Sequence, residues 1–194
     1  QGHPVDGSLF RLRPLPRPEA LPRHLSEAES QQLETYLRHR LDTADPLLRL
    51  ENACLAVLAH TGLRASELLD LQFQDLDLSG RRLIVRQGKG QRDRVVYLSS
   101  LAGQAIECYL EGTTRPPTAP LWTRSAGQAC SYSWLRAHVA ACGLAAGVQG
   151  LTAHRLRHTL ATRLLNAGMD ISRIQKLLGH EQITTTQIYA RVLD

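Results

Sequence analysis

Six polar residues of the sequence have the side chains that phosphodiester cleavage requires. They are two arginines, two histidines, a lysine and a tyrosine, in the order Arg64, Lys89, His154, Arg157, His180 and Tyr189. Guanidinium groups make charge-assisted hydrogen bonds, often two at once, to a phosphate that gathers negative charge. A tyrosine can attack the phosphorus, and a lysine can protonate the departing oxygen, which an arginine essentially cannot do. The residue types therefore predict a phosphodiester-cleaving site that requires no metal ion.

Three polar positions fall within one predicted helix. His154, Arg157 and His158 stand at i, i+3 and i+4, so their side chains would share one face. Leucines recur every four residues on another face, which predicts the packing side: Leu156, Leu160 and Leu164. Histidines at i and i+4 can also share a zinc ion, but no glutamate lies between these two and no cysteine cluster is nearby. The pattern favours a helix with one packing face and one working face, and no metal.

The tyrosine and the lysine each need a particular setting. An unperturbed phenol has a pKa of about 10, so Tyr189 requires a nearby proton acceptor and arginine charge to become a nucleophile. Lys89 lies between two glycines that allow a mobile tip, and it is one of only two lysines in the chain. Three arginines near it in sequence are available for neighbouring phosphates: Arg86, Arg92 and Arg94. Taken singly, each residue type also has an ordinary role, as a packing tyrosine, a hairpin lysine or an arginine in a surface ion pair.

The elements that would position these residues are predicted from hydrophobic spacing and from signals at helix ends. Ser26 and Glu29 form a capping-box pattern at the start of the first helix. A second helix is expected over 46–61, and Gly62 can end it directly before Arg64. Three strands are expected at 71–78, 82–86 and 94–98. Further helices are expected near 100–111, 131–142, 153–167, 171–178 and 184–193. The predicted fold is mainly α with a small antiparallel β-sheet (α+β).

Composition and charge narrow the class of protein. The 194 residues are 43% hydrophobic, as in an ordinary globular domain, and the net charge of +5 with a pI near 9.3 suits a polyanionic partner. Residues 1–24 hold five of the nine prolines and predict an extended linker ahead of a domain at 25–194. Four widely spaced cysteines predict free thiols in a reducing cytoplasm. No signal peptide or membrane-crossing apolar run is present, so we expect a cytoplasmic protein with no membrane partner.

From about Leu21 to its end, the chain resembles the catalytic domain of the tyrosine recombinase (phage integrase) family. The matching pieces are Thr-Gly-Leu-Arg-x-x-Glu-Leu at 61–68, the hairpin lysine, His154-Arg-Leu-Arg157-His158, Leu178-Gly179-His180, and Tyr189 nine residues later. Each piece alone is a weak signal, and all of them in this order form a strong one. The resemblance implies that residues 1–24 are a linker or the end of a missing N-terminal DNA-binding domain, and that 25–194 are the catalytic domain.

The resemblance also implies roles for the site residues. The implied catalytic residues are Arg64, Lys89, His154, Arg157, His180 and Tyr189, with Glu67 and His158 in support. Tyr189 would attack a DNA phosphate to give a 3'-phosphotyrosyl enzyme and a free 5' hydroxyl. His154 would help manage the proton of the nucleophile, and His180 would contact a phosphate oxygen.

Partners and alternatives follow from the same resemblance. The implied partner is double-stranded DNA, with a homotetramer on DNA for the full-length protein and a weakly binding monomer for this fragment. Neither ATP nor a nucleotide cofactor is expected, and the chain has no Gly-x-x-x-x-Gly-Lys-Ser/Thr phosphate loop. Two alternatives are a type IB topoisomerase-like enzyme that relaxes DNA and a non-catalytic DNA-binding regulator on the same fold.

Overall fold

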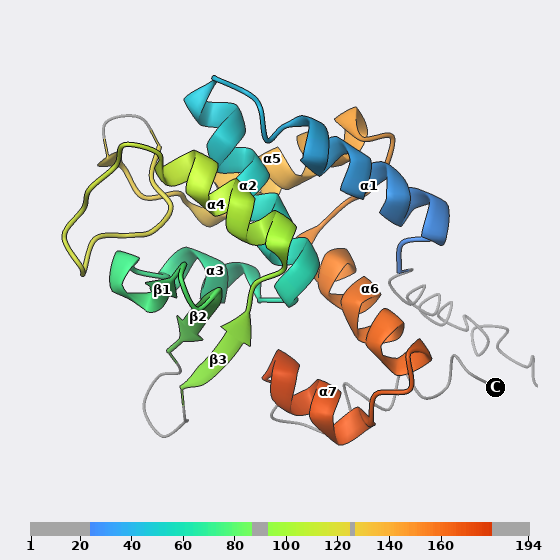
Figure 1. Cartoon of the computed structure of the whole chain (residues 1–194). Helices are drawn as coiled ribbons and strands as arrows, with labels where there is room; N and C mark the ends of the chain where they lie inside the picture. Colours follow the sequence, from blue (N-terminus) through green and yellow to red (C-terminus); the bar gives the residue numbers. More distant parts are fainter. Residues whose placement is uncertain (1–23, 87–92, 125–126, 180–194) are drawn as a thin grey trace, which may run out of the picture.

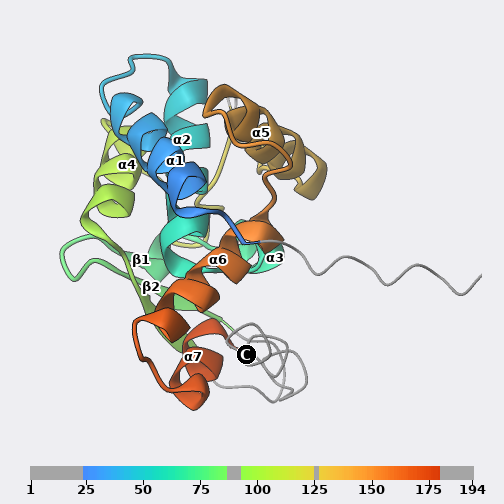
Figure 2. The same ribbon diagram turned by 90° about the vertical axis from the view of Figure 1, so that its right-hand side faces the viewer.

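The computed structural model describes residues 24–86, 93–124 and 127–179, and these form a group of helices with one small sheet at its side (Figures 1 and 2). In chain order the elements are α1 (Glu27–His39), α2 (Pro46–Thr61), α3 (Ala65–Asp70), the 3-10 turn η1 (Phe73–Asp75), β1 (Leu76–Asp77), β2 (Arg82–Val85), β3 (Arg94–Tyr97), α4 (Ser100–Leu110), α5 (Tyr132–Ala145), α6 (Ala153–Asn166) and α7 (Ile171–Leu178). The predicted mainly α fold with a small antiparallel sheet is confirmed. The predicted helix at 184–193 lies outside the described residues, as does nearly all of the predicted linker.

Helix α2 forms the centre of the molecule and contacts α1, α3, α4, α5 and α6 (Figure 1). The sequence starts it with Asp45, whose carboxylate accepts a hydrogen bond from the backbone N–H of Leu47 at 2.8 Å, and with Pro46 in the first turn. It ends at Gly62, which has the left-handed φ of 65°. Both predicted end signals are confirmed, and together they fix where the chain leaves the core.

Helix α1 begins with the predicted capping box. The backbone N–H of Glu29 donates to Ser26 Oγ at 3.1 Å, and the backbone N–H of Ser26 donates to Glu29 Oε2 at 2.8 Å. The same carboxylate also pairs with Arg155 at 2.7 Å from Oε1. The cap therefore stabilises the start of α1 and ties it to α6.

The sheet has the order β1-β2-β3, with both pairs antiparallel. Its inward side chains are buried and its alternate ones are exposed, as period-2 strands require: Leu83, Val85 and Val96 face the core, whereas Ile84, Val95 and Tyr97 face outward. In the β2–β3 register Val85 pairs with Arg94. Arg94 therefore lies where β3 begins, at the end of the hairpin next to residues 87–92.

The predicted strand at 71–78 is wrong over most of its length. Only Leu76–Asp77 form a strand, and Phe73–Asp75 form the 3-10 turn η1. The backbone donors of Phe73 and Gln74 bind the carbonyls of Ala119 and Pro117, both at 2.9 Å. A loop that is distant in sequence takes these hydrogen bonds, so they are not available to a sheet ladder.

The remaining described elements lie close to their predicted ranges. Helix α5 continues to Ala145, past the predicted end at 142, and the short helix α3 was not predicted. All four cysteines are free, as predicted, and three of them are buried: Cys54, Cys130 and Cys142. No helix in the described ranges is both long and apolar enough to span a membrane.

Candidate active site

Gly62 brings the end of α2 against α6 and α7. A Cβ at this position would lie 2.7 Å from Leu178 Cδ2 and 3.0 Å from Leu160 Cδ2, so a side chain does not fit without a shift. The positive φ of Gly62 also favours glycine. Because Arg64 follows two residues later, this close approach places it beside the C-terminal end of α7.

Arg157 is buried between the ends of two helices. The residue is 5% exposed. Its Nη1 donates to the Gly62 carbonyl and its Nη2 donates to the Leu178 carbonyl, both at 2.7 Å. The C-terminal carbonyls of a helix carry a partial negative charge, so a guanidinium is favourable at this position. Arg157 thus connects the ends of α2 and α7 and holds a positive charge at their junction.

Arg64 reaches the same junction from the other side. Its Nη2 donates to the Gly179 carbonyl at 2.8 Å, next along the chain from the carbonyl that Arg157 binds. Its Nη1 donates to Glu67 Oε1 at 3.0 Å. The Arg64 side chain is 45% exposed, in contrast to Arg157. The structure therefore brings the two predicted phosphate ligands together, with Arg64 open to solvent and Arg157 behind it.

Glu67 is shared by three arginines. Arg94 makes a two-point contact with its carboxylate, at 2.9 Å from Nη1 and 2.8 Å from Nη2. The backbone N–H of Arg64 donates to Glu67 Oε2 at 2.7 Å, and Arg157 Nη1 lies 4.0 Å from the same oxygen. Three positive charges face one negative charge, which leaves a net +2 in this group of four side chains. Such a surplus suits an anionic ligand.

The protonation state of Glu67 follows from these contacts. Burial by itself would raise the pKa of the carboxyl. The hydrogen bond from Arg94 and that from the Arg64 backbone, together with the charges of both arginines, outweigh burial and hold the pKa of Glu67 below its ordinary value. Glu67 is therefore a carboxylate at neutral pH and an acceptor for the arginines around it.

The two described histidines of the candidate site differ in exposure. His154 is exposed in the first turn of α6, whereas His158 is 6% exposed one turn later. The His158 ring meets the His24 ring edge-on, with the centroids 5.9 Å apart. The expected working face of α6 is thus mostly packed, because Arg157 and His158 are both buried and only His154 is open to solvent.

Burial lowers the pKa of His158, and the charges of His24 and His154 lower it further. We expect the free energy of unfolding to fall as the pH decreases below about 6.5, because the unfolded chain then binds protons that folded His158 resists. The loss should be complete below the lowered pKa of His158. Thermal unfolding of the wild type and of His158→Asn between about pH 8 and 5 measures this. The variant should show a flatter pH dependence, and equal slopes would contradict the expectation.

Several predicted site residues lie outside the described residues: Lys89, Arg92, His180 and Tyr189. The elements that flank them are described. Strands β2 and β3 bound the segment with Lys89 and Arg92, and α7 ends two residues before His180. Arg94 at the start of β3 contacts Glu67, and Leu178 at the end of α7 contacts Arg157. Both flanking elements are therefore fixed to the same arginine group.

Two of the arginines predicted to contact DNA make carboxylate contacts. The Arg86 Nε donates to Asp75 Oδ1 at 2.7 Å, and the Arg86 side chain is still 54% exposed. The Arg94 side chain is 11% exposed, and both of its terminal nitrogens bind Glu67. DNA contact stays a prediction for both residues, and the geometry suits it better at Arg86 than at Arg94.

The helix-end carbonyls were not anticipated from the sequence. Gly62 and Gly179 both occupy the left-handed position that ends a helix. A glycine that ends a helix signals nearby carbonyls without an intrahelical partner, which an arginine can bind. That signal was present in the sequence, but it does not say which arginine would come there.

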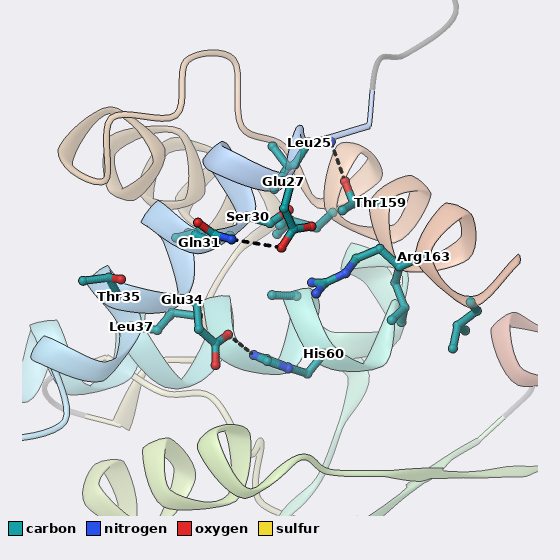
Figure 3. A pocket seen from close by; sticks show the side chains of 15 residues that line it. Leu25, Glu27, Ser30, Gln31, Glu34, Thr35, Leu37, His60, Thr159 and Arg163 are labelled. Carbon is teal, nitrogen blue, oxygen red and sulfur yellow. Dashed lines mark hydrogen bonds and ion pairs between the residues drawn. The ribbon is translucent and has the colours of Figure 1, made fainter. Parts of the chain in front are cut away.

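A separate cavity of about 600 Å³ lies between α1, α2 and α6 (Figure 3). Glu34 and His60 contact each other in its lining, with 3.3 Å between Oε2 and Nε2, and Arg163 points toward it from α6. None of the arginines of the candidate site lines it.

Within the described ranges, no three His, Cys, Asp or Glu side chains are placed to hold a metal ion, so a zinc site at His154 and His158 has no third ligand among these residues.

Comparison with known proteins finds relatives of this chain over most of its length. The phage integrase family model matches residues 23–194. Tyrosine recombinase XerA from Thermococcus kodakarensis is 35% identical over 199 residues, which cover 97% of this chain and 64% of the relative. Tyrosine recombinase XerC from Lactobacillus delbrueckii subsp. bulgaricus is 35% identical over 159 residues, which cover 78% of this chain and 54% of the relative. The chain thus spans less than two thirds of either relative.

Solved structures give the same fold. A crystal structure of XerA recombinase superimposes with a TM-score of 0.74 at 33% identity, covering 91% of this chain and 61% of that one. A post-cleavage complex of the XerH site-specific recombinase with a palindromic difH substrate superimposes with a TM-score of 0.75 at 22% identity, covering 89% and 50%, a likeness of fold. With the family match over 23–194, these findings show that the chain belongs to the phage integrase family, the tyrosine recombinases.

Proposed function

We propose that this chain cleaves and rejoins double-stranded DNA at specific sites through a 3'-phosphotyrosyl intermediate. The observation that carries the proposal is the meeting of Arg64 and Arg157 at the junction of α2 and α7, with Glu67 between them. Membership of the phage integrase family and relatives named tyrosine recombinases support it. The related XerH structure holds a palindromic difH substrate after cleavage.

The proposed reaction assigns a step to each catalytic residue. Arg64 and Arg157 hold the non-bridging oxygens of the phosphate, and His180 adds a further contact there. His154, which is exposed beside Arg157 on α6, accepts the phenol proton while the Tyr189 oxygen attacks the phosphorus.

As the bond from tyrosine to phosphorus forms, the bond from phosphorus to the sugar 5' oxygen breaks, and Lys89 protonates that oxygen. A 5' hydroxyl then reverses these steps and releases the tyrosine. The phosphotyrosyl bond conserves the energy of the phosphodiester, so the cycle needs no ATP.

The remaining assignments concern partners and organisation. Residues 25–194 act as the catalytic domain and 1–24 as a linker, and Arg86 and Arg92 contact phosphates beside the cleaved one. The full-length protein works as a tetramer on DNA in the cytoplasm, whereas this chain alone is a monomer. The exposed Arg86 side chain and the net charge of +5 support the DNA contacts.

A trapping experiment tests the reaction. The chain is incubated at low salt with a library of nicked duplexes of randomised sequence, in which cleavage beside the nick releases a short fragment and prevents rejoining. We expect a covalent protein–DNA adduct that survives SDS and that forms in EDTA without ATP. Protease digestion and mass spectrometry should find the DNA on Tyr189. Specific DNA binding without an adduct would favour the regulator, and relaxation of a supercoiled plasmid without recombinant products would favour the topoisomerase-like enzyme.

A further inference from the structure

Arg94 is placed to orient other side chains of the candidate site. It begins β3, directly after residues 87–92 and Asp93; its backbone pairs with Val85 of β2, and its side chain reaches Glu67 of α3. Its guanidinium binds Glu67 with both terminal nitrogens, the planar two-point geometry that arginine makes with a carboxylate. The pair is shielded from solvent, because the Arg94 side chain is 11% exposed and the Glu67 side chain is 12% exposed.

Glu67 passes this constraint on to Arg64. The same carboxylate accepts the Arg64 backbone N–H at 2.7 Å and Arg64 Nη1 at 3.0 Å, and it lies 4.0 Å from Arg157 Nη1. Without Arg94, the Glu67 carboxylate would lose two of its hydrogen bonds, and its position would be less fixed. The Arg64 side chain is 45% exposed, so it depends on Glu67 and the Gly179 carbonyl for a fixed orientation.

We propose that Arg94 is a positioning residue for the cleavage reaction: by holding Glu67, it orients the Arg64 guanidinium and fixes the strand that follows the Lys89 segment to the arginine pair. This inference rests on the proposed function. It gives Arg94 a task other than the phosphate contact expected from residue type, because both of its terminal nitrogens already bind a charged carboxylate and its Nε is buried.

Measuring both the cleavage rate and the DNA affinity of variants distinguishes a positioning residue from a residue that contacts a phosphate. With Arg94→Gln, we expect single-turnover cleavage at saturating DNA to fall by about 10- to 100-fold, because Arg64 loses its orientation. DNA affinity and its salt dependence should stay close to those of the wild type. Arg86→Gln provides the contrast, since loss of a phosphate contact should weaken binding and reduce the salt slope by about one. Arg38→Gln, an exposed arginine of α1 that pairs with Glu34, is the matched control and should change neither quantity.

A second measurement does not depend on activity. In the wild type, Arg94 contributes to the lowered pKa of Glu67, so Arg94→Gln should raise the pKa of this carboxyl in an NMR titration. The Arg64 Nε–H signal should broaden in the same variant. Arg94→Lys keeps the charge without the two-point contact, so it should give an intermediate result, and it serves if Arg94→Gln does not fold. Adding Glu67→Gln to Arg94→Gln should cause little further loss of cleavage, because both changes break the same contact, the one between Arg94 and Glu67.

The outcomes separate this inference from the proposed function. An unchanged Glu67 pKa and an unchanged Arg64 signal in Arg94→Gln would overturn the positioning role even if the wild type cleaves DNA. Weaker, less salt-dependent binding with normal cleavage at saturation would also overturn it and would return Arg94 to the DNA contacts. If the wild type forms no adduct with any duplex, the proposed function fails, while the two NMR measurements still decide whether Arg94 controls Glu67 and Arg64.

Discussion

Tyr189→Phe is expected to bind DNA as the wild type does and to form no detectable covalent adduct. The exchange removes one oxygen, the atom proposed to attack the phosphorus, and leaves the aromatic ring for packing. The measurement is a denaturing gel after incubation with the nicked duplexes, with a DNA titration of both proteins at the same salt concentration. Tyr132→Phe is the matched control, because Tyr132 is 62% exposed on α5, and it should form the adduct normally.

The surroundings of two of the other tyrosines, Tyr36 and Tyr109, support this expectation. The Tyr36 hydroxyl accepts a hydrogen bond from Arg40, and burial, followed by the contact with Cys142, raises the pKa of this phenol well above its ordinary value. The Tyr109 hydroxyl binds the Leu121 carbonyl at 3.1 Å and accepts the Thr123 backbone N–H at 2.9 Å. Neither hydroxyl is available as a nucleophile. An adduct that persists in Tyr189→Phe would mean that another residue carries the DNA, and digestion of that adduct would identify it.

The sequence predicted best those features that depend on residues near one another in the chain. The capping box of Ser26 and Glu29 and the helix end at Gly62 are set by local hydrogen bonds and backbone angles, and the structure confirms both. The strand predicted at 71–78 was wrong because Ala119 and Pro117 bind its backbone donors. No pattern within eight residues contains that information.

In the candidate site too, local sequence features were predicted, whereas features that depend on contacts between distant residues were not. Motif order brought Arg64 and Arg157 to attention, but residue type could not tell that Arg157 is buried at 5% exposure while Arg64 is open. Nor could it separate Arg94 from Arg86, two arginines that flank the same hairpin. Their difference arises from what the fold places opposite each of them: Glu67, which faces three arginines, or Asp75, which caps a 3-10 turn.

Arg157→Ala is expected to lose both catalysis and stability, because this side chain has two tasks. Cleavage at saturating DNA should fall by roughly 10²- to 10³-fold or more, the loss seen when one preorganised donor to a developing anion is removed. The free energy of unfolding should also fall by about 3 kcal/mol, because the Gly62 and Leu178 carbonyls lose a charged donor and a gap remains between α2 and α7.

Stability and catalysis can be measured apart. Cleavage is compared at a temperature at which thermal unfolding shows both proteins to be folded, so that the rate reflects the site alone. Arg157→Lys keeps a positive charge but has one nitrogen where the wild type uses two, so it cannot reproduce both 2.7 Å contacts and should recover only part of either loss. Arg163→Ala, an exposed arginine in the last turn of the same helix, should leave both quantities near the wild-type values. If Arg157→Ala lost stability and cleaved at the wild-type rate while folded, Arg157 would be a structural link between two helix ends, and the phosphate would need another ligand.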